Sequence, residues 1–251
     1  NTLRYFIDLS YNGTHYHGWQ IQPNATTVQA ILNKALSTLL KSTVNCMGAG
    51  RTDTGVHAAQ MLAHFDSKII FDIVEISFKL NAFLPRDIAV NSIIRVNSDA
   101  HARFDATNRT YVYKICSIKD VFEYDKSHYF TRPLNVNLMN EACQILMQYK
   151  DFECFSRARS DVKTFICNIS HAQWIQTAER IEFKITADRF LRNMVRAVVG
   201  TMLDVGMQNT SLADFHQIIK SKNRANAGAS APAKGLYLTQ IKYPNSVYLH
   251  D

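Results

Sequence analysis

The chain has 251 residues, of which 47% are hydrophobic, and it carries a formal net charge of +7 at pH 7. That length can bury a sizeable core, in one large domain or in two of roughly a hundred residues each. We expect no membrane span, because no apolar run approaches the ~20 residues that cross a bilayer. We also expect no disulfide framework, because the five cysteines include no C-x-x-C pair and are typical of a reduced, cytoplasmic protein.

The positive charge is concentrated in the second part of the chain. Residues 1–100 hold 8 basic and 7 acidic residues, which leaves 20 and 14 for residues 101–251. A basic excess on one part of a chain is the electrostatic footprint of a protein with a phosphate-rich partner, although many basic proteins bind no nucleic acid. Charge alone therefore makes nucleic acid a candidate partner.

The first hundred residues predict the order β-α-β-β-α-β. Residues 3–11 alternate as a strand, and Thr26-Thr-Val-Gln29 predicts a capping box before an amphipathic helix. The elements expected next are a strand around 44–48, a strand near 59–66, a helix over 72–83 stopped by Pro85, and a strand near 88–96. This is the split βαβ order of ferredoxin-like folds.

The second half predicts a similar order of elements. They are a strand at 109–118, a helix at 137–150, strands at 171–177 and 180–187, helices at 189–205 and 211–221, and a strand at 236–243. We therefore predict an α+β fold of two ferredoxin-like halves, residues 1–100 and 101–251. Each half would lay helices on one face of an antiparallel sheet, and the sheets would flank a central cleft that is the expected active site.

A glycine-rich loop after the second predicted strand carries one carboxylate. In Gly48-Ala-Gly-Arg-Thr-Asp-Thr-Gly-Val-His-Ala58, Asp53 stands two residues after Arg51, among small residues that let a large ligand approach the backbone. A nearby arginine favours the ionised, nucleophilic form of an aspartate. An ordinary turn uses the same residue types for backbone reasons, so the loop by itself leaves both interpretations open.

Two better-known motifs do not fit the sequence. The segment Gly50–Gly55 has the spacing of a P-loop, but Val56-His57 stands where that loop requires Lys followed by Ser or Thr, which excludes a nucleoside triphosphatase of that kind. Cys154, Cys167 and His171 lack the first closely spaced pair of a zinc finger. We therefore expect no metal site, and we expect the cysteines to fill the core.

Two segments of the second half combine aromatic or apolar residues with arginine. On the strand predicted from 109, Arg109, Tyr111 and Tyr113 share a face that could stack a base, although tyrosine is common in strands for other reasons. On the helix predicted from 189, Arg196 follows an apolar stripe most closely. A guanidinium there could hold a carboxylate from another element, and a solvated basic face is the alternative.

A series of segments in chain order resembles one known family, the TruA-type tRNA pseudouridine synthases. The resemblance runs along almost the whole chain, and its most specific part is Gly50-Arg-Thr-Asp-Thr-Gly-Val-His57. The other segments are Tyr11-Asn-Gly-Thr-His-Tyr-His-Gly-Trp-Gln20, Thr27-Val-Gln29, Leu84-Pro-x-Asp-Ile88, Ala102-Arg-Phe-Asp-Ala106, Arg109-x-Tyr-x-Tyr113, Phe190-Leu-x-x-Met-Val-Arg196 and Ala231-Pro-Ala-x-Gly-Leu-Tyr-Leu238.

The resemblance implies the pseudouridine synthase fold and an isomerase that converts uridine to pseudouridine at positions 38, 39 and 40 of the anticodon stem-loop of tRNA. It implies that Asp53 is the catalytic aspartate, that Arg51 holds or displaces the target base, and that Tyr111 stacks on the uracil. Arg196 would pair with the aspartate, and Leu236 would pack beside the base. It further implies a cytoplasmic homodimer that binds tRNA and needs neither metal nor organic cofactor.

Two positions depart from the family pattern. Thr54 stands where a smaller residue is usual, a change we expect to be tolerated, and Cys167 stands where arginine is common, so the resemblance carries no RNA contact there. Two other functions fit parts of the sequence. A non-catalytic RNA-binding protein would need the basic face but not Asp53, and an acid-base enzyme on a small phosphorylated metabolite would not need basic residues spread over the second half.

Overall fold

The structure is a computed structural model in which residues 1–249 are described. The chain divides into two compact units, one made of Asn1–Asn108 with the C-terminal segment from Tyr237, the other of Arg109–Leu236. The predicted division into folding domains at residue 100 stays a prediction. Over the described residues, none of the helices combines the length and apolar character that crossing a membrane requires.

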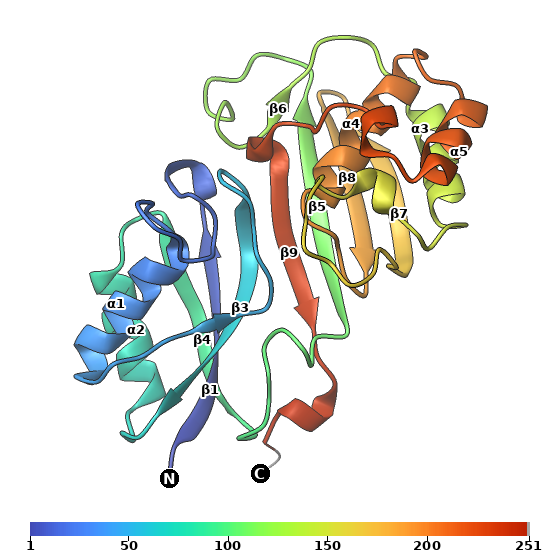
Figure 1. Cartoon of the computed structure of the whole chain (residues 1–251). Coiled ribbons are helices and arrows are strands. Elements are labelled where there is room, and N and C mark those ends of the chain that lie inside the picture. The colour runs from blue at the N-terminus through green and yellow to red at the C-terminus, as the bar shows by residue number, and fades with distance from the viewer. Residues whose placement is uncertain (250–251) are drawn as a thin grey trace. The chain divides into compact units, whose positions relative to one another are not determined.

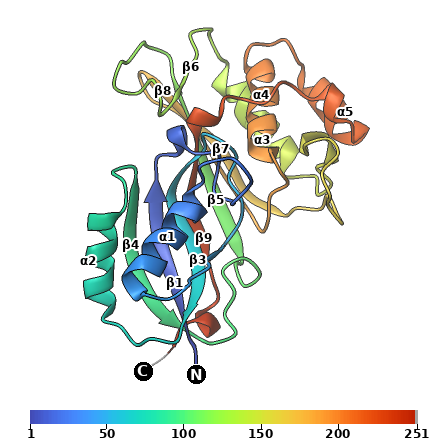
Figure 2. The same ribbon diagram turned by 60° about the vertical axis from the view of Figure 1, so that its left-hand side comes forward.

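The first unit is a sheet with two helices on one face (Figures 1 and 2). Its elements are β1 (Leu3–Tyr11), α1 (Val28–Leu40), β2 (Met47–Gly48), β3 (His57–Ser67), α2 (Ile73–Phe83) and β4 (Ile88–Val96), and it is joined by β9 (Leu236–Lys242) from the end of the chain. The strand order is β4-β1-β3-β9, and β2 pairs with β3. The predicted βαββαβ order is therefore confirmed for this part of the chain.

One sheet contact of the first unit differs from the expectation of a purely antiparallel sheet. Strand β1 is antiparallel to both β3 and β4, but β9 runs parallel to β3, with His57 opposite Tyr237 and Ala58 opposite Leu238. A parallel partner must come from elsewhere in the chain, because a short hairpin connects only antiparallel strands. The final strand thus pairs with β3, the strand that begins directly after the glycine-rich loop.

The start of α1 corrects the predicted capping box. Thr27 is the N-cap, and its hydroxyl accepts the backbone N–H of Ala30. The side chain of Gln29 does not reach back to the cap, because it accepts the N–H of Ile21 and donates to the carbonyl of Cys46 over 2.6 Å. Gln29 therefore fixes the chain on both sides of the helix rather than its first turn.

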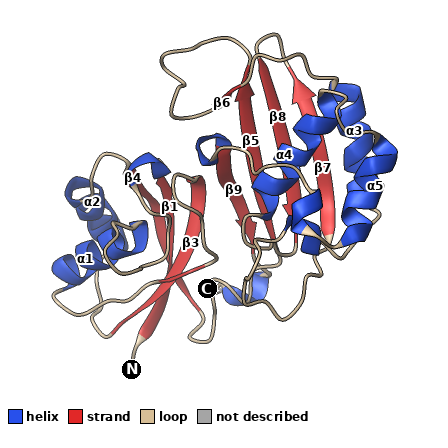
Figure 3. Ribbon diagram, turned by 45° about the horizontal axis from the view of Figure 1, so that its top comes forward, coloured by secondary structure: helices blue, strands red, loops and turns tan. Residues whose placement is uncertain are grey.

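The second unit is a three-stranded antiparallel sheet with three helices on one side (Figure 3). Its elements are β5 (Asn108–Cys116), β6 (His128–Tyr129), α3 (Val136–Leu146), β7 (Ile169–Gln176), β8 (Arg180–Ala187), α4 (Met194–Gly206) and α5 (Leu212–Ser221). The order is β5-β8-β7, and β6 pairs parallel to β5. Trp174 on β7 links sheet and helices, since its indole Nε1 lies 3.2 Å from Met202 Sδ on α4. The predicted α+β class is confirmed.

Helix α4 begins later than predicted. The sequence pattern places a helix over 189–205, but the helix starts at Met194 because Asn193 adopts a left-handed conformation, with φ of +65°. Arg189 and Arg192 therefore lie in the preceding turn, where the backbone N–H of Arg157 donates to the carbonyl of Arg192. Of the predicted row of arginines, Arg196 alone stands on the helix.

Candidate active site

Hydrogen bonds from the segment 11–19 fix the glycine-rich loop between β2 and β3. The hydroxyls of Tyr11 and Thr52 share a buried hydrogen bond of 2.8 Å, and the backbone N–H of Trp19 donates to the carbonyl of Thr52. On the far side of the loop, the N–H of Gly55 donates to the carbonyl of Tyr16. These bonds position the two residues between Thr52 and Gly55, so this local structure depends on both segments.

Two glycines of the supporting segment allow the loop to approach closely. A Cβ on Gly13 would lie 1.9 Å from the carbonyl oxygen of Val56, and a Cβ on Gly18 would lie 2.2 Å from that of Thr52. Gly18 also has a φ of +76°, a conformation that side chains disfavour. Any side chain at either position would push the loop away from its support.

Asp53 opens a tight turn at the tip of the loop. Its carbonyl accepts the N–H of Val56 over 3.1 Å, and Gly55, the third residue of the turn, has a φ of +82°. A positive φ at that place is what a type II turn requires. Asp53 is half-buried and Thr54 is exposed, so the hydroxyl-bearing residue that departs from the family pattern meets no obstacle.

Arg51 does not pair with Asp53 in the structure. It is exposed, and its side chain makes no ion pair or hydrogen bond with the described residues, although it lies two residues from the carboxylate. Its guanidinium is thus directed to solvent, where a ligand could meet it. Asp53, by contrast, is half-buried and interacts with other groups.

His57 was not singled out by the sequence analysis, yet it fixes the exit of the loop. Its ring is 2% exposed, its Nδ1 accepts the backbone N–H of Gly13 over 2.9 Å, and its centroid lies 4.7 Å from that of Tyr237. Because Nδ1 accepts, the neutral ring carries its proton on Nε2. The only signal in the sequence is its place directly after the Gly55-Val56 step.

In the second unit, Tyr111 and Tyr113 differ in what their rings can do. Tyr111 is half-buried and meets Phe190 edge-on, with centroids 5.1 Å apart and ring planes at 87°. Tyr113 is fully buried, its hydroxyl donates to the carbonyl of Pro232 over 2.8 Å, and its ring lies against Gly235. The predicted stacking face is therefore reduced to Tyr111, and Phe190 is a neighbour that the sequence did not suggest.

Arg196 is held by the segment that follows α5. Its Nε donates to the carbonyl of Ala231 over 2.8 Å, and the N–H of Ala231 donates back to the carbonyl of Arg196 over 2.9 Å. These reciprocal bonds fix the position of the guanidinium Nε. Leu236, at the start of β9, is 5% exposed.

The family model described as tRNA pseudouridine synthase matches residues 9–105 and 142–244. The chain belongs to this family. It is 51% identical over 247 residues to the tRNA pseudouridine synthase A of Bacteroides fragilis, with 98% of each chain covered, and 38% identical over 247 residues to that of Bacillus subtilis, with 97% of this chain and all of the relative covered. The resemblance stated from the motifs is confirmed.

Most of the synthase motifs within the first unit touch the glycine-rich loop or its support. The N-terminal signature supplies Gly13, Tyr16 and Gly18, and the pair Leu84-Pro85 leads to Asp87, whose carboxylate accepts the hydroxyl of Tyr16 over 2.5 Å. The Ala102–Ala106 segment is the exception and lies elsewhere in the unit. Most of the family signature is thus a scaffold for one short turn.

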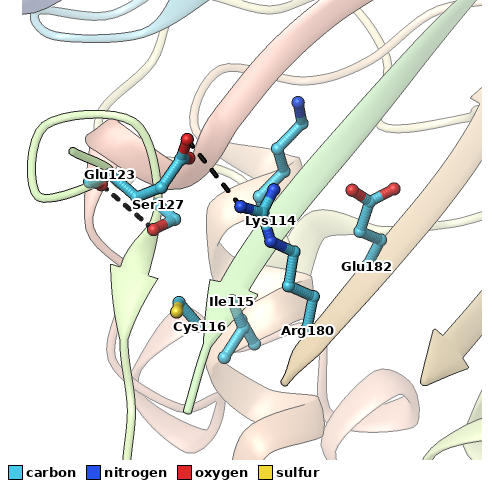
Figure 4. A pocket seen from close by; sticks show the side chains of 7 residues that line it. All are labelled: Lys114, Ile115, Cys116, Glu123, Ser127, Arg180 and Glu182. Atoms are coloured by element: carbon cyan, nitrogen blue, oxygen red, sulfur yellow. Dashed lines mark hydrogen bonds and ion pairs between the residues drawn. The ribbon is translucent and has the colours of Figure 1, made fainter. Parts of the chain in front are cut away.

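A pocket in the second unit lies apart from all of these residues (Figure 4). It is lined by Lys114, Ile115, Cys116, Glu123, Ser127, Arg180 and Glu182. Arg180 and Glu123 form an ion pair of 3.8 Å at its mouth, and the Ser127 hydroxyl donates to the Glu123 carbonyl. None of the predicted synthase residues lines this pocket.

The described residues contain no group of three or more His, Cys, Asp and Glu side chains that could hold a metal ion. The five cysteines are all buried, and burial raises the pKa of the Cys167 thiol to about 11. Its Sγ lies 4.0 Å from Met194 Sδ. Cys167 is therefore part of the core packing.

Proposed function

We propose that this chain isomerises uridine to pseudouridine in the anticodon stem-loop of tRNA, with Asp53 as the catalytic carboxylate. The observation that carries the proposal is the turn that opens at Asp53, which two glycines and buried hydrogen bonds support from below. A half-buried carboxylate whose backbone is fixed by several supporting contacts is typical of a preorganised site. Family membership supports the reaction type, and the turn supports the choice of Asp53.

The reaction moves a base without a change of redox state. The glycosidic bond between N1 and C1′ breaks, the uracil turns, C5 joins C1′, and the proton on C5 leaves. Asp53 can take the proton from C2′, attack C1′, or add to C6 of the base, each of which uses an ionised carboxylate. All three routes hold the free base in the site until it is rejoined, and none of them needs a metal or an organic cofactor.

Contacts made on substrate binding must offset the free energy needed to unstack the target uridine. Flipping a nucleotide costs a few kcal/mol, which stacking on an aromatic ring offsets. We assign that stacking to Tyr111, whose ring orientation is set by Phe190, and we assign the displacement of the base to the exposed Arg51. Leu236 supplies an apolar contact beside the base.

Arg196 is assigned to the catalytic carboxylate itself. Its Nε donates to Ala231, and the planar guanidinium is the group that an aspartate carboxylate accepts bidentately. Such a pair keeps the carboxylate ionised and limits its rotation. Arg196 and Asp53 belong to different compact units, so the pair would make catalysis depend on both.

The test uses tRNA that carries tritium at C5 of uridine. The intact protein should release tritium, and Asp53→Asn, which keeps the shape of the side chain, should lower the rate by about a thousandfold or more while tRNA binding is retained. Thr54→Ala is the matched control from the same turn and should release tritium normally. Absence of release by the intact protein from every unmodified tRNA tried would contradict the proposal.

A homodimer in the cytoplasm completes the proposal. Its support is the family resemblance, together with cysteines that are all unpaired, as in a reducing compartment. Sedimentation equilibrium of the purified chain measures the oligomeric state directly, and we expect a mass twice that of the 28.6 kDa chain.

A further inference from the structure

A tight turn after β4 presents the ring of Phe104 to solvent, with 75% of the residue exposed. Behind that ring the imidazole of His101 is stacked at a centroid distance of 4.2 Å and an interplanar angle of 27°. The guanidinium carbon of Arg103 lies 5.6 Å from the centroid of the same ring. These three residues, which we call the 101–104 platform, belong to or adjoin the Ala102–Ala106 segment, to which the proposed chemistry gives no role.

The backbone of the turn closes around His101. Its Nδ1 accepts the N–H groups of Arg103 and Phe104, each over 3.1 Å, and the carboxylate of Asp105 accepts the N–H of His101 over 2.7 Å. Burial lowers the pKa of His101, which keeps Nδ1 an acceptor at neutral pH. The ring that backs Phe104 is therefore held by its own turn.

The platform is also anchored to the core of its unit. His64 on β3 is 7% exposed and meets the ring of His101 edge-on, with centroids 4.5 Å apart and planes at 69°. The Nδ1 of His64 accepts the N–H of Ala102 over 3.0 Å. A chain of contacts thus runs from a buried histidine to an exposed phenylalanine.

An exposed apolar side chain alone says little, but this one is ordered before any ligand arrives. Stacking on a rigid aromatic ring avoids the entropy that a mobile side chain would lose on binding. Aromatic faces of this kind stack on nucleobases whatever their sequence, and a neighbouring arginine adds attraction for the phosphate backbone. The aromatic ring and the arginine of the platform therefore suit a polymer with flat bases and an anionic backbone.

We propose that the 101–104 platform stacks on an unpaired nucleobase of the bound tRNA, at a nucleotide other than the uridine that reacts. The proposal rests on the proposed function, because it takes tRNA as the ligand. A protein partner fits less well, since the charged and exposed Arg103 lies beside Phe104, and a protein interface needs a larger apolar centre.

The first experiment measures the dissociation constant for unmodified tRNA at fixed salt. Phe104→Ala should weaken binding by about tenfold or more, since base stacking is lost, and Phe104→Leu should weaken it similarly because an aliphatic group does not replace a π-face. Phe104→Tyr should bind within about twofold of the unsubstituted protein. In tritium release the loss should appear as a higher KM with kcat nearly unchanged.

The matched control is Phe78→Ala on α2. Phe78 is 76% exposed, as Phe104 is, but its ring has no aromatic partner among the described residues. It should bind tRNA normally, and thermal unfolding of both variants should match the parent because neither ring is buried. A second readout is Phe104→Trp, whose added fluorescence should be quenched when tRNA stacks on it, since Trp19 and Trp174 are buried.

Three results would overturn the proposal. Unchanged tRNA affinity of Phe104→Ala is the first, and affinity retained by Phe104→Leu is the second, because it would reduce the contact to apolar burial. The third is a changed sedimentation mass of Phe104→Ala with unchanged tRNA affinity, which would make this surface a contact between protein chains. Failure of the intact protein to release tritium is a separate result, and it would count against the proposed reaction instead.

Discussion

The backbone N–H of Gly13 donates to Nδ1 of His57 over 2.9 Å. Gly13 begins a short 3₁₀ turn directly after β1, and His57 begins β3 directly after the loop of Asp53. The bond therefore joins the end of one strand to the start of its neighbour at the point where the loop leaves the sheet. Since the same glycine also faces the carbonyl of Val56, a single small residue serves both the hydrogen bond and the close approach.

Gly13→Ala should displace the loop of Asp53. The added Cβ would lie 1.9 Å from the carbonyl oxygen of Val56, so the backbone must move. A shift of about 1 Å at a reacting group can cost about a hundredfold in rate, and we expect that loss in tritium release. The free energy of unfolding in urea should fall by about 1–3 kcal/mol.

Gly50→Ala is the stability control for this change. Gly50 belongs to the same loop, but a Cβ there would meet no atom within 4 Å and its φ is not positive. Its free energy of unfolding should equal that of the parent or exceed it slightly. Equal destabilisation by the two substitutions would show that the contact with Val56 is not the cause.

Tyr111→Phe separates the ring of this residue from its hydroxyl. The edge-on contact with Phe190 and the stacking face are kept, so the KM for tRNA should stay within about twofold. If the hydroxyl accepts the last proton from C5, kcat should fall by about a hundredfold or more. Tyr111→Ala should raise KM as well. A Phe variant with full kcat would restrict Tyr111 to stacking.

Arg196→Lys should impair catalysis although it keeps the charge. Lysine carries all its donors on one nitrogen and lacks the planar fork of a guanidinium, so it cannot reproduce the Nε bond to Ala231 together with a bidentate carboxylate pair. We expect kcat to fall by about tenfold to a hundredfold, with the free energy of unfolding lower by about 1 kcal/mol. Arg192→Lys, at an exposed arginine of the preceding turn, is the control and should be neutral. Full activity of Arg196→Lys would refute the assigned pair.

The parts of the fold with a plain local signal were predictable. Strands β1 and β4 begin and end where the alternation of residues 3–11 and 88–96 places them. The start of α4 was not predictable, because helical spacing continues through Asn193 while the backbone of that residue turns left-handed. The position of β9 in the first unit was missed for another reason, since sequence order does not tell which earlier strand a late strand will join.

The residues of the site also divide into those with a local sequence signal and those without one. Asp53 stands out in sequence because glycines and an arginine surround it, and Tyr111 and Arg196 because their segments resemble the family. His57 and Phe190 stand in segments that also resemble the family, but the sequence assigns them no role because their contacts come from residues far away in the chain, Gly13 for one and Tyr111 for the other. Contacts of that kind leave no periodic pattern and become visible only in three dimensions.

His64 predicts a dependence of stability on pH. Burial lowers its pKa from 6.5 to about 4, so the unfolded state binds more protons than the folded state between these values. The stability that the neutral ring supplies is present above pH 6.5 and is lost as the pH falls towards 4. The difference is on the order of 3 kcal/mol for this group, measured as the free energy of unfolding in urea at pH 4.5 and pH 7.

His64→Gln should remove much of that dependence, because the amide oxygen can accept the N–H of Ala102 but does not titrate. A smaller slope of the same sign should remain, since burial also lowers the pKa of His101 and of His128. Arg4 and Asp66 act outside this window, because their hydrogen bond lowers the pKa of the Asp66 carboxyl from 3.8. His15→Gln, at an exposed histidine, should leave the slope intact. If His64→Gln kept the full slope between pH 4.5 and pH 7, the buried ring would not be its source.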